Sequence, residues 1–454
     1  MLAKLSLCRT APLGERWYQC DDCHEITKLY NSCGDRHCPG CGGAKRAEWS
    51  DSSGKLLLSG VDYYQVIFTL PQILSELALA NRGVLADLLF QSAWKATRKT
   101  ITKEQGYDPA ALMVLHTWNQ KLESHWHVHA LVPGGGPSLV DGSWKKAQAP
   151  QRDYLPNFGR QRKYLVDAIN LRTSYRKFAI NHLQRLRRDG ELRFGGSLEY
   201  LRDDDAWDAL VEQLESVEWV SHIEPPQGDH SRPEHVVRYL TRYLTGGPIS
   251  DHRILSADDQ NVRFLTREGK VVGGESRQVP YTLPTTEFVR RWCLHIQPDQ
   301  LTKTRSFGGW SNTHRTDYLA RCRSALDSAG LADESKRSPT PSTSEAYSRV
   351  PLPVCSHCGS DSLNLISEFR KPSWAEVLSS QSAICPVWYA ESLEAEERQW
   401  WDGRMGAGFY GFYDEYLKTH AENARVGSAG QAPRSHQPWL PGLESDGNLL
   451  PTSL

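Results

Sequence analysis

The sequence predicts an α+β protein built on a ferredoxin-like antiparallel sheet that carries its helices on one face. The first observation behind this prediction is the order of the patterned segments, which is β-α-β-β-α-β followed by a further helix. The second is the cysteine-rich stretch 1–50, which follows neither the helical nor the strand period. The third is the stretch 329–350, whose serine, proline and charged residues are typical of a linker. We therefore expect an N-terminal cysteine-organised module, a sheet domain and a small C-terminal unit.

The spacing of apolar residues predicts the strands and the helix in the first half of the sheet domain. Residues 61–71 alternate between apolar and polar side chains like a half-buried strand, and 73–102 repeats leucines at spacings of three and four like a helix. The short apolar runs 111–118 and 125–132 flank a polar NQKLES segment, which predicts a β-hairpin. The second run ends in PGGGP, which the interior of a strand or helix does not tolerate.

The second half of the domain continues with a basic helix over 160–189, a strand over 217–224 closed by two prolines, and a helix over 235–244. Short strands follow from residue 251 onwards. The boundaries are then 55–250 for the sheet domain, 251–328 for a β-rich extension, 351–418 for the C-terminal unit with one more CxxC pair, and 419–454 for a disordered tail.

Length and composition restrict the class of protein to which the chain can belong. The 454 residues leave room for two to four domains. Hydrophobic residues make up 39% and the mean hydropathy is −0.55, which is polar for a globular chain, while the 10% aromatic content is too high for a wholly disordered one. No apolar run reaches the length of a membrane helix or of a signal peptide. We expect a cytoplasmic protein with no membrane partner, in which thiols stay reduced.

The charge of the chain is segregated rather than uniform. The net charge of −1 excludes a uniformly basic protein that coats nucleic acid. By count, residues 152–194 hold eleven lysines and arginines against four acidic residues, whereas 200–218 hold seven acidic residues and one arginine. Only the first stretch could face phosphates.

The strongest local signal is a pair of CxxC motifs within the first fifty residues. Cys20 and Cys23 form the first pair, and Cys38 and Cys41 form the second. Four thiolates in two tight turns can hold a tetrahedral zinc ion, whose binding folds a module too small to fold alone. We predict a structural zinc on these four cysteines. Three neighbouring residues lie close enough to replace one ligand or to join a second site: Cys33, His24 and His37.

A further CxxC pair, Cys355 and Cys358, lies far downstream. It could hold a second zinc ion with Cys385 or His357, but two clear thiolates do not decide the question.

A cluster of histidines occupies the segment HWHVHALV. In a strand, residues two apart point to the same face, so His125, His127 and His129 share one face. Imidazoles gathered on a rigid strand form a platform for a divalent metal. The alternative is that these histidines are partly buried and only pack.

Two tyrosines, Tyr239 and Tyr243, lie four residues apart on the predicted helix 235–244 and therefore share one face. Core packing is the alternative reading of this spacing. Arg238 and Arg242 would point to a neighbouring face, where they could bind phosphate. A tyrosine makes sense as a nucleophile only beside a metal-bound phosphodiester, because a phenol of pKa about 10 needs its developing phenolate to be stabilised.

Taken together in their order, these motifs resemble a known family. The ordered set comprises the two N-terminal CxxC pairs, FTLP, HTWNQKL, HVH before LVPGGG, RYLTRYL and FGGWSN. It resembles the transposases of rolling-circle insertion sequences of the insertion-sequence ninety-one (IS91) type. These belong to the HUH single-strand nuclease superfamily, and the resemblance covers about residues 1–325. It implies the HUH nuclease fold and a bacterial, nucleoid-associated protein.

The resemblance also implies roles for single residues. His127 and His129 look like the histidine pair that holds a Mg or Mn ion. Tyr239 and Tyr243 look like the paired nucleophiles of the two-tyrosine subclass. In such enzymes a tyrosine attacks a phosphate of single-stranded DNA and leaves a five-prime phosphotyrosine and a free three-prime hydroxyl. The N-terminal cysteines look like that family's zinc-binding DNA module.

Single-stranded DNA at the element ends and at the target is the partner that follows from this resemblance. The basic helix 160–189 and the abundant tryptophans would suit phosphate contacts and base stacking. The arginines expected to contact DNA are Arg185, Arg187, Arg188, Arg238 and Arg242. A solvated charged face is the alternative for the helix.

Some positions depart from the family pattern. Glu224 stands where relatives often carry a lysine. The third metal ligand that some HUH enzymes draw from the nucleophile's helix would fall on Tyr243, so the candidates left open include His125, His235 and Gln120. A plasmid replication initiator or relaxase using the same chemistry, and a non-catalytic zinc-dependent DNA-binding protein, are the competing functions. A zinc hydrolase or deaminase using His127 and His129 is disfavoured because the sequence has no HxE…PCxxC pattern to support it.

Overall fold

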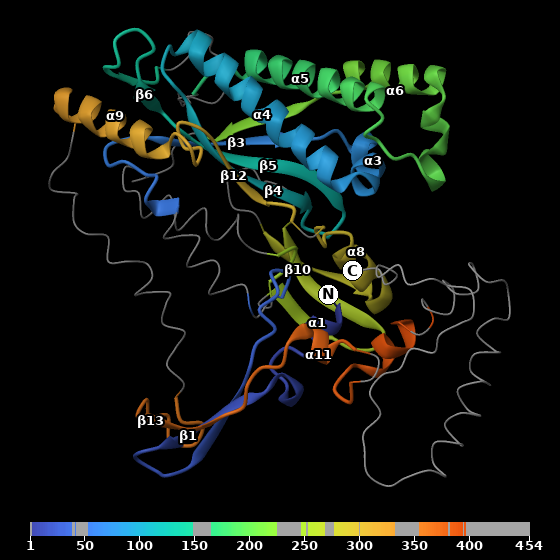
Figure 1. Ribbon diagram of the computed structural model, residues 1–454. Helices are drawn as coiled ribbons and strands as arrows, with labels where there is room; N and C mark the ends of the chain where they lie inside the picture. The colour runs from blue at the N-terminus through green and yellow to red at the C-terminus, as the bar shows by residue number, and fades with distance from the viewer. Residues whose placement is uncertain are drawn as a thin grey trace, which may run out of the picture. The chain divides into compact units, whose positions relative to one another are not determined.

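The structure is a computed structural model, shown in Figure 1. It describes residues 2–38, 41, 53–148, 165–224, 247–250, 253–267, 277–298, 300–331, 354–379, 382–393 and 395. The chain divides into two compact units, essentially residues 3–371 and 372–454. Among the described residues of the second unit, α11 (Trp374–Val377) begins with a capping box between Ser373 and Glu376. Within these ranges, no helix is both long and apolar enough to cross a membrane.

A five-stranded antiparallel sheet forms the centre of the first unit. Its strand order is β12-β4-β5-β3-β8, so β5 lies in the middle between β4 and β3. The bounds are Tyr63–Thr69 for β3, Ala110–Trp118 for β4, Ser124–Pro133 for β5, Val220–Glu224 for β8 and Thr304–Gly308 for β12. The predicted hairpin and the predicted first and last strands of the domain are confirmed.

The helices α4 (Arg82–Glu104) and α5 (Ala168–Arg188) lie side by side over one face of this sheet (Figure 1). Alternate strand residues such as Phe68, Met113 and Val128 point to that face and form one buried core with the helices. The α+β arrangement with helices against an antiparallel sheet is therefore confirmed. The shorter helices of this layer are η2 (Gln72–Leu74), α3 (Ser75–Ala80), η3 (Gly196–Arg202) and α6 (Asp204–Ser216).

Caps determine where these helices begin. The predicted helix 73–102 is interrupted at Asn81, whose amide donates hydrogen bonds to the carbonyls of Leu77 and Arg193. Asp167 accepts hydrogen bonds from two backbone N–H groups at the start of α5, and Asp203 caps α6 in the same way. The predicted start of the basic helix at residue 160 lies outside the described residues.

A second core covers part of the opposite face of the sheet. Strand residues Leu112 and Leu131 pack there against Trp310 and against Tyr318 of α9 (Arg315–Ser328). The FGGWSN segment permits this packing, because a Cβ atom on Gly309 would lie 2.1 Å from the ring of Tyr318. The short hairpin of β6 (Gly135–Pro137) and β7 (Trp144–Lys146) contacts α9.

The β-rich extension is smaller than predicted. It comprises β9 (Ile254–Ala257), β10 (Asn261–Arg267), β11 (Gln278–Pro284) and α8 (Thr285–Cys293), which form a three-stranded sheet and a helix around Phe264. The end of the predicted range 251–328 belongs elsewhere, because β12 pairs with β4 and α9 packs on the central sheet. The predicted boundary is corrected accordingly.

The N-terminal module contains a second three-stranded sheet, in the order β13-β1-β2. Its elements are α1 (Leu2–Ser6), η1 (Ala11–Leu13), β1 (Glu15–Cys20), β2 (Ile26–Tyr30) and β13 (Leu363–Glu368). The expectation of a separate unit over 351–418 is wrong for its first part, because β13 pairs along β1. The predicted linker from residue 332 onwards and the predicted tail lie outside the described residues.

Candidate active site and metal centres

Three histidines converge on the face of the sheet opposite α4 and α5. His127 and His129 lie on β5, and His116 lies on β4 directly across from His127. The ring centroids are 5.3 Å apart for His116 and His127, 4.7 Å for His116 and His129, and 5.0 Å for His127 and His129. One nitrogen of each ring lies within 4.8 Å of the others, which is close enough to share one ion. The structure thus adds His116 as a third candidate ligand to the predicted pair of His127 and His129, and the sequence offers no signal for it.

Hydrogen bonds fix the orientation of two of these rings. The Nδ1 atom of His127 lies 2.9 Å from the carbonyl of His125, to which it can donate a proton, and this leaves Nε2 free for a metal. The Nδ1 atom of His129 lies 2.6 Å from the amide of Gln65. Binding a metal through Nε2 requires Nδ1 of His129 to carry the proton, so Gln65 must then present its amide oxygen. His125 contributes its carbonyl and does not join the ligand group.

The electrostatic setting keeps these imidazoles neutral. Burial, followed by repulsion from His129 and His125, lowers the pKa of His127 to about 3. Burial lowers the pKa of His129 to about 4. Neutral imidazoles keep their lone pairs available, which is the state that binds a metal.

His116 is held in place from the other side by an aromatic residue. The ring of Trp118 stacks on that of His116 at 4.8 Å, with 19° between the planes. The ammonium of Lys303 lies 4.5 Å from the centroid of the Trp118 ring. The third imidazole is therefore fixed by packing as well as by the pairing of β4 with β5.

The edge strand β8 contributes a contact between a histidine and a glutamate to the same face. His222 lies opposite Ile67 of β3, which itself lies opposite His129. The Nε2 atom of His222 lies 3.0 Å from a carboxylate oxygen of Glu224. Glu224 therefore has a partner of its own at the position where the family pattern favours a lysine.

The two predicted nucleophiles, Tyr239 and Tyr243, lie outside the described residues, as do Arg238, Arg242 and His235. The chain before and after them is described. Strand β8 ends at Glu224 on the edge of the sheet, and the chain is described again from residue 247, where Ile249 belongs to the same buried cluster as Leu122 in the turn of the β4–β5 hairpin. Strand β5, which carries His127 and His129, is separated from β8 by β3 alone and forms the hairpin with β4.

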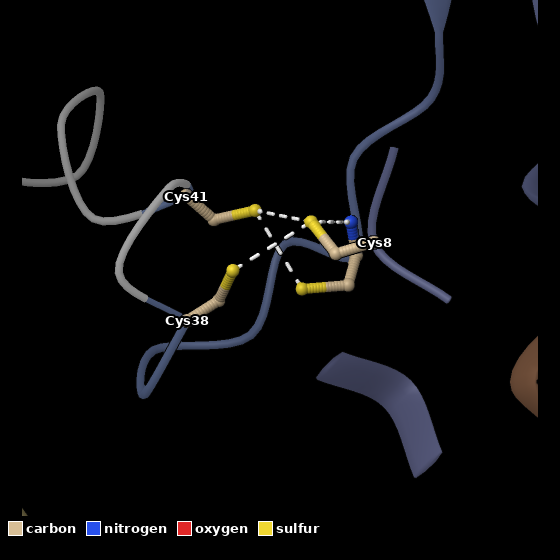
Figure 2. A group of neighbouring side chains, drawn as sticks. Cys8, Cys38 and Cys41 are labelled. Carbon is tan, nitrogen blue, oxygen red and sulfur yellow. Dashed lines mark hydrogen bonds between the residues drawn. The ribbon is translucent and has the colours of Figure 1, made fainter. Parts of the chain in front are cut away.

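The predicted zinc site is corrected by the structure. Cys38 and Cys41 join Cys8 and Cys33, whereas Cys20 and Cys23 lie in a different group. In the first group the sulfur atoms point toward one another (Figure 2), with 3.4 Å between Cys8 and Cys41, 3.6 Å between Cys33 and Cys41, and 3.6 Å between Cys8 and Cys38. A tetrahedral site with Zn–S bonds of about 2.3 Å has edges of about 3.8 Å, so this group has the size that zinc requires.

The β1–β2 hairpin explains this difference. It carries Cys20 and Cys23 at its turn, away from Cys38 and Cys41, which are grouped with Cys8 and Cys33 instead. The sequence offers Cys33 as a substitute ligand but gives no signal for Cys8, because a cysteine 25 residues upstream of its partner forms no local motif. His37 is not a ligand, since its two ring nitrogens lie 3.0 Å from Asp35 and 3.2 Å from the backbone N of Gln297.

Comparisons with known proteins agree with this geometry. Residues 110–317 match a family model described as "Putative transposase", and residues 1–70 match one described as "Transposase zinc-binding domain". The "Putative transposase y4qJ" of Sinorhizobium fredii (strain NBRC 101917 / NGR234) is 32% identical over 342 residues, which cover 75% of this chain and 81% of that protein. The chain belongs to the IS91 family of rolling-circle transposases.

A second relative of this transposase is the "Transposase for insertion sequence element IS801" of Pseudomonas savastanoi pv. phaseolicola. It is 26% identical over 331 residues, which cover 72% of this chain and 74% of the relative. No solved structure matches the chain significantly. The region matched by the zinc-binding family contains Cys8, Cys33, Cys38 and Cys41, and the other matched region contains all three histidines.

The predicted DNA-contacting arginines of the transposase do not all have the same surroundings. Arg187 forms an ion pair with Asp204 at 2.7 Å, lies over the ring of Trp207, and donates to the carbonyls of Arg202 and Asp203. These contacts hold α6 against α5, and the predicted role of Arg187 in DNA binding stays a prediction. Arg185 and Arg188, by contrast, are exposed at the C-terminal end of α5.

Proposed function

We propose that this transposase nicks and rejoins single-stranded DNA by metal-assisted attack of a tyrosine during rolling-circle transposition. The tyrosine oxygen forms a bond to the DNA phosphorus, and the bond to the three-prime oxygen breaks. The products are a five-prime phosphotyrosine and a free three-prime hydroxyl. The observation that carries the proposal is the convergence of His116, His127 and His129 on one face of the two central strands.

The topology supports assignment to the HUH nuclease fold. In the order β4-β5-β3-β8, each helical crossover joins two strands that have one other strand between them. This is the split β-α-β arrangement of a ferredoxin-like sheet. Helices α4 and α5 cover one face of this sheet, and the histidines lie on the other face, part of which α9 covers.

The residues present fit a divalent cation, for which we propose Mg or Mn. Three imidazoles can hold such an ion through their nitrogen lone pairs and leave further coordination positions open to phosphate oxygens. The bound ion would polarise the scissile phosphate and offset the charge that develops on it. Because Mg prefers oxygen ligands and three imidazoles supply only nitrogen, we infer that Mn is the better-bound of the two.

We propose Tyr239 and Tyr243 as the nucleophiles. The segment that contains them joins Glu224 on the edge strand to Ile249 beside the β4–β5 hairpin. Neighbouring strands are about 4.8 Å apart, so the histidines on β5 lie only about 10 Å across the sheet from β8. Helices α4 and α5 fill the opposite face, so a nucleophile can reach the histidines only from the face that carries them.

We propose that Arg238 and Arg242 bind DNA phosphates beside the tyrosines. Arg185 and Arg188 are further candidates for phosphate contacts. They lie on α5, in the layer behind the sheet, so they would contact DNA away from the histidines.

Detection of a covalent adduct tests the proposed chemistry. The full-length chain is incubated with single-stranded oligonucleotides from the ends of the element and with Mn, then separated under denaturing conditions. We expect an adduct that survives denaturant, that disappears in the Tyr239→Phe/Tyr243→Phe variant and that falls strongly in His127→Ala. Tyr200→Phe, at an exposed position on η3, is the matched control and should leave the adduct unchanged.

Two results would contradict the proposal. The first is an adduct that persists at full yield in the double phenylalanine variant, since another nucleophile would then be at work. The second is the absence of an adduct on every end sequence, which would point to a DNA-binding protein without this activity.

A further inference from the structure

A second group of four cysteines joins the two distant ends of the first compact unit. Cys20 and Cys23 come from the N-terminal module, and Cys355 and Cys358 come from more than 330 residues later. The sulfur atoms of Cys20 and Cys358 are 3.6 Å apart, and those of Cys23 and Cys355 are 3.5 Å apart. All four sulfur atoms lie within 4.8 Å of one another, which is close to the about 3.8 Å edges of a tetrahedral zinc–thiolate site.

The two CxxC turns of this group have the same backbone structure. In each turn the N–H of the first cysteine donates to the carbonyl five residues later, and its carbonyl accepts from the N–H four residues later. In each turn the residue after the second cysteine has a positive φ, 61° at His24 and 78° at Gly359. The four bonds are Cys20 N to Glu25 O at 3.0 Å, His24 N to Cys20 O at 3.0 Å, Cys355 N to Ser360 O at 2.7 Å, and Gly359 N to Cys355 O at 2.9 Å.

Polar contacts hold the two turns against each other. The backbone N–H of Ser356 donates to the hydroxyl of Thr27, which is buried, at 3.1 Å. The backbone N–H of Asp21 donates to the carbonyl of Ser362 at 3.0 Å, and the hydroxyl of Ser362 donates to the carboxylate of Asp21 at 2.7 Å. Beyond the turns, β13 pairs with β1 along its whole length. Two matched half-sites therefore face each other in a fixed register.

We propose that Cys20, Cys23, Cys355 and Cys358 bind a second structural zinc ion. The ion fastens residues 354–371 to the N-terminal module and closes the intervening chain, including the whole histidine-bearing sheet, into one loop. Four thiolates in a tetrahedron suit zinc or iron. Zinc is the assignment because the neighbouring group of four cysteines lies in a region that matches a zinc-binding domain. The family match over residues 1–70 contains only half of this second site.

The metal content of the purified full-length chain tests the proposal. We expect two zinc ions per chain in the wild type and one in the Cys355→Ser/Cys358→Ser variant. Cys20→Ser/Cys23→Ser should lose the same single ion, and the variant that combines all four substitutions should still retain one. Cys293→Ser/Cys385→Ser is the matched control and should keep two, because these cysteines belong to neither group.

If the variant with all four substitutions lost two zinc ions, the two cysteine pairs would not share one site. A Cys355→Ser/Cys358→Ser variant that keeps both ions would also overturn the proposal. One iron in place of the second zinc would overturn the assignment of the metal.

A second measurement does not depend on the stability of the cysteine variants. A protease recognition sequence is inserted between residues 340 and 341 of the otherwise unchanged chain. After cleavage, the C-terminal fragment should stay bound until a chelator removes zinc, and immediate dissociation in the presence of zinc would contradict the proposal.

Discussion

His116 supplies the third imidazole from a strand other than the one that carries His127 and His129. Two residues on one strand share a face whatever their partner strand is, so that pair could be predicted from the sequence. The third could not, because its position depends on the register of β4 against β5. That register is set by the turn between them, where Leu122 has a positive φ of 62°. A slip of one residue would have turned His116 to the opposite face.

The ligand set leads to a prediction about metal preference. The His116→Asp variant replaces one nitrogen ligand with a carboxylate, which Mg binds better than imidazole. We expect the ratio of Mg-supported to Mn-supported adduct formation to rise by about tenfold or more, measured at saturating oligonucleotide. His314→Asp, in the loop before α9, is the control and should leave the ratio unchanged. An unchanged ratio in His116→Asp would mean that residue 116 is not a ligand.

Gln65 leads to a second prediction, because its amide is the partner of His129. Gln65→Leu removes that partner and should weaken Mn binding by about 10–100-fold, as loss of an orienting hydrogen bond to a metal ligand typically does. Gln65→Glu retains an acceptor for the Nδ1 proton and should restore most of the affinity. Both affinities can be measured by titration calorimetry. If Gln65→Leu bound Mn as tightly as the wild type, the orienting role would be excluded; Gln19→Leu on β1 controls for a general effect of leucine.

Elements with their own period were predictable, and elements defined by distant partners were not. The strands β3, β4 and β5 alternate or form apolar runs, and α4 repeats its apolar residues at helical spacing. By contrast, β12 has five residues, all partly buried, and pairs with a strand nearly two hundred residues earlier. The same holds for β13, which local patterning placed in a separate unit.

The basic face of α5 gives a prediction at the level of helix packing. Arg187→Ala removes an ion pair, two hydrogen bonds to carbonyls and a cation–π contact that join α5 to α6. The carboxylate of its partner Asp204 is largely exposed, so we expect a loss of about 1–2 kcal/mol in the free energy of unfolding. Urea denaturation measures this loss. Arg188→Ala, whose contact with Asp189 is 3.7 Å long and exposed, should change stability far less.

DNA binding by Arg187→Ala tests whether this arginine contacts phosphate in addition to joining α5 to α6. Arg187→Ala should bind single-stranded oligonucleotide as the wild type does, at a temperature where both are folded. A weaker affinity with a smaller salt dependence in Arg187→Ala would show instead that this guanidinium contacts phosphate.

Across the whole chain, segments that are far apart in the sequence combine into one structural unit. The N-terminal module is completed by residues 354–371, so a chain that contains only its N-terminal part lacks one strand and two thiols. Arg36 adds a link to the segment between α8 and β12 by donating to the carbonyls of Gln297, Pro298 and Leu301. Sequence patterning finds neither connection, because each joins segments more than 250 residues apart.

Truncation at two positions tests this interdependence. A chain that ends at residue 371 keeps β13 and all eight clustered cysteines, so it should bind as much zinc as the full-length chain and melt at a similar temperature. A chain that ends at residue 331 loses β13, the ion pair of Arg16 with Glu368 and half of one cysteine group. It should bind one zinc ion fewer, and its Tm should fall by roughly 4 °C or more, since each kcal/mol lost lowers the Tm of a chain of this size by a few degrees. Differential scanning calorimetry with metal analysis measures both quantities. If the shorter chain matched the longer one in zinc content and in Tm, residues 354–371 would be an appendage rather than part of the N-terminal module.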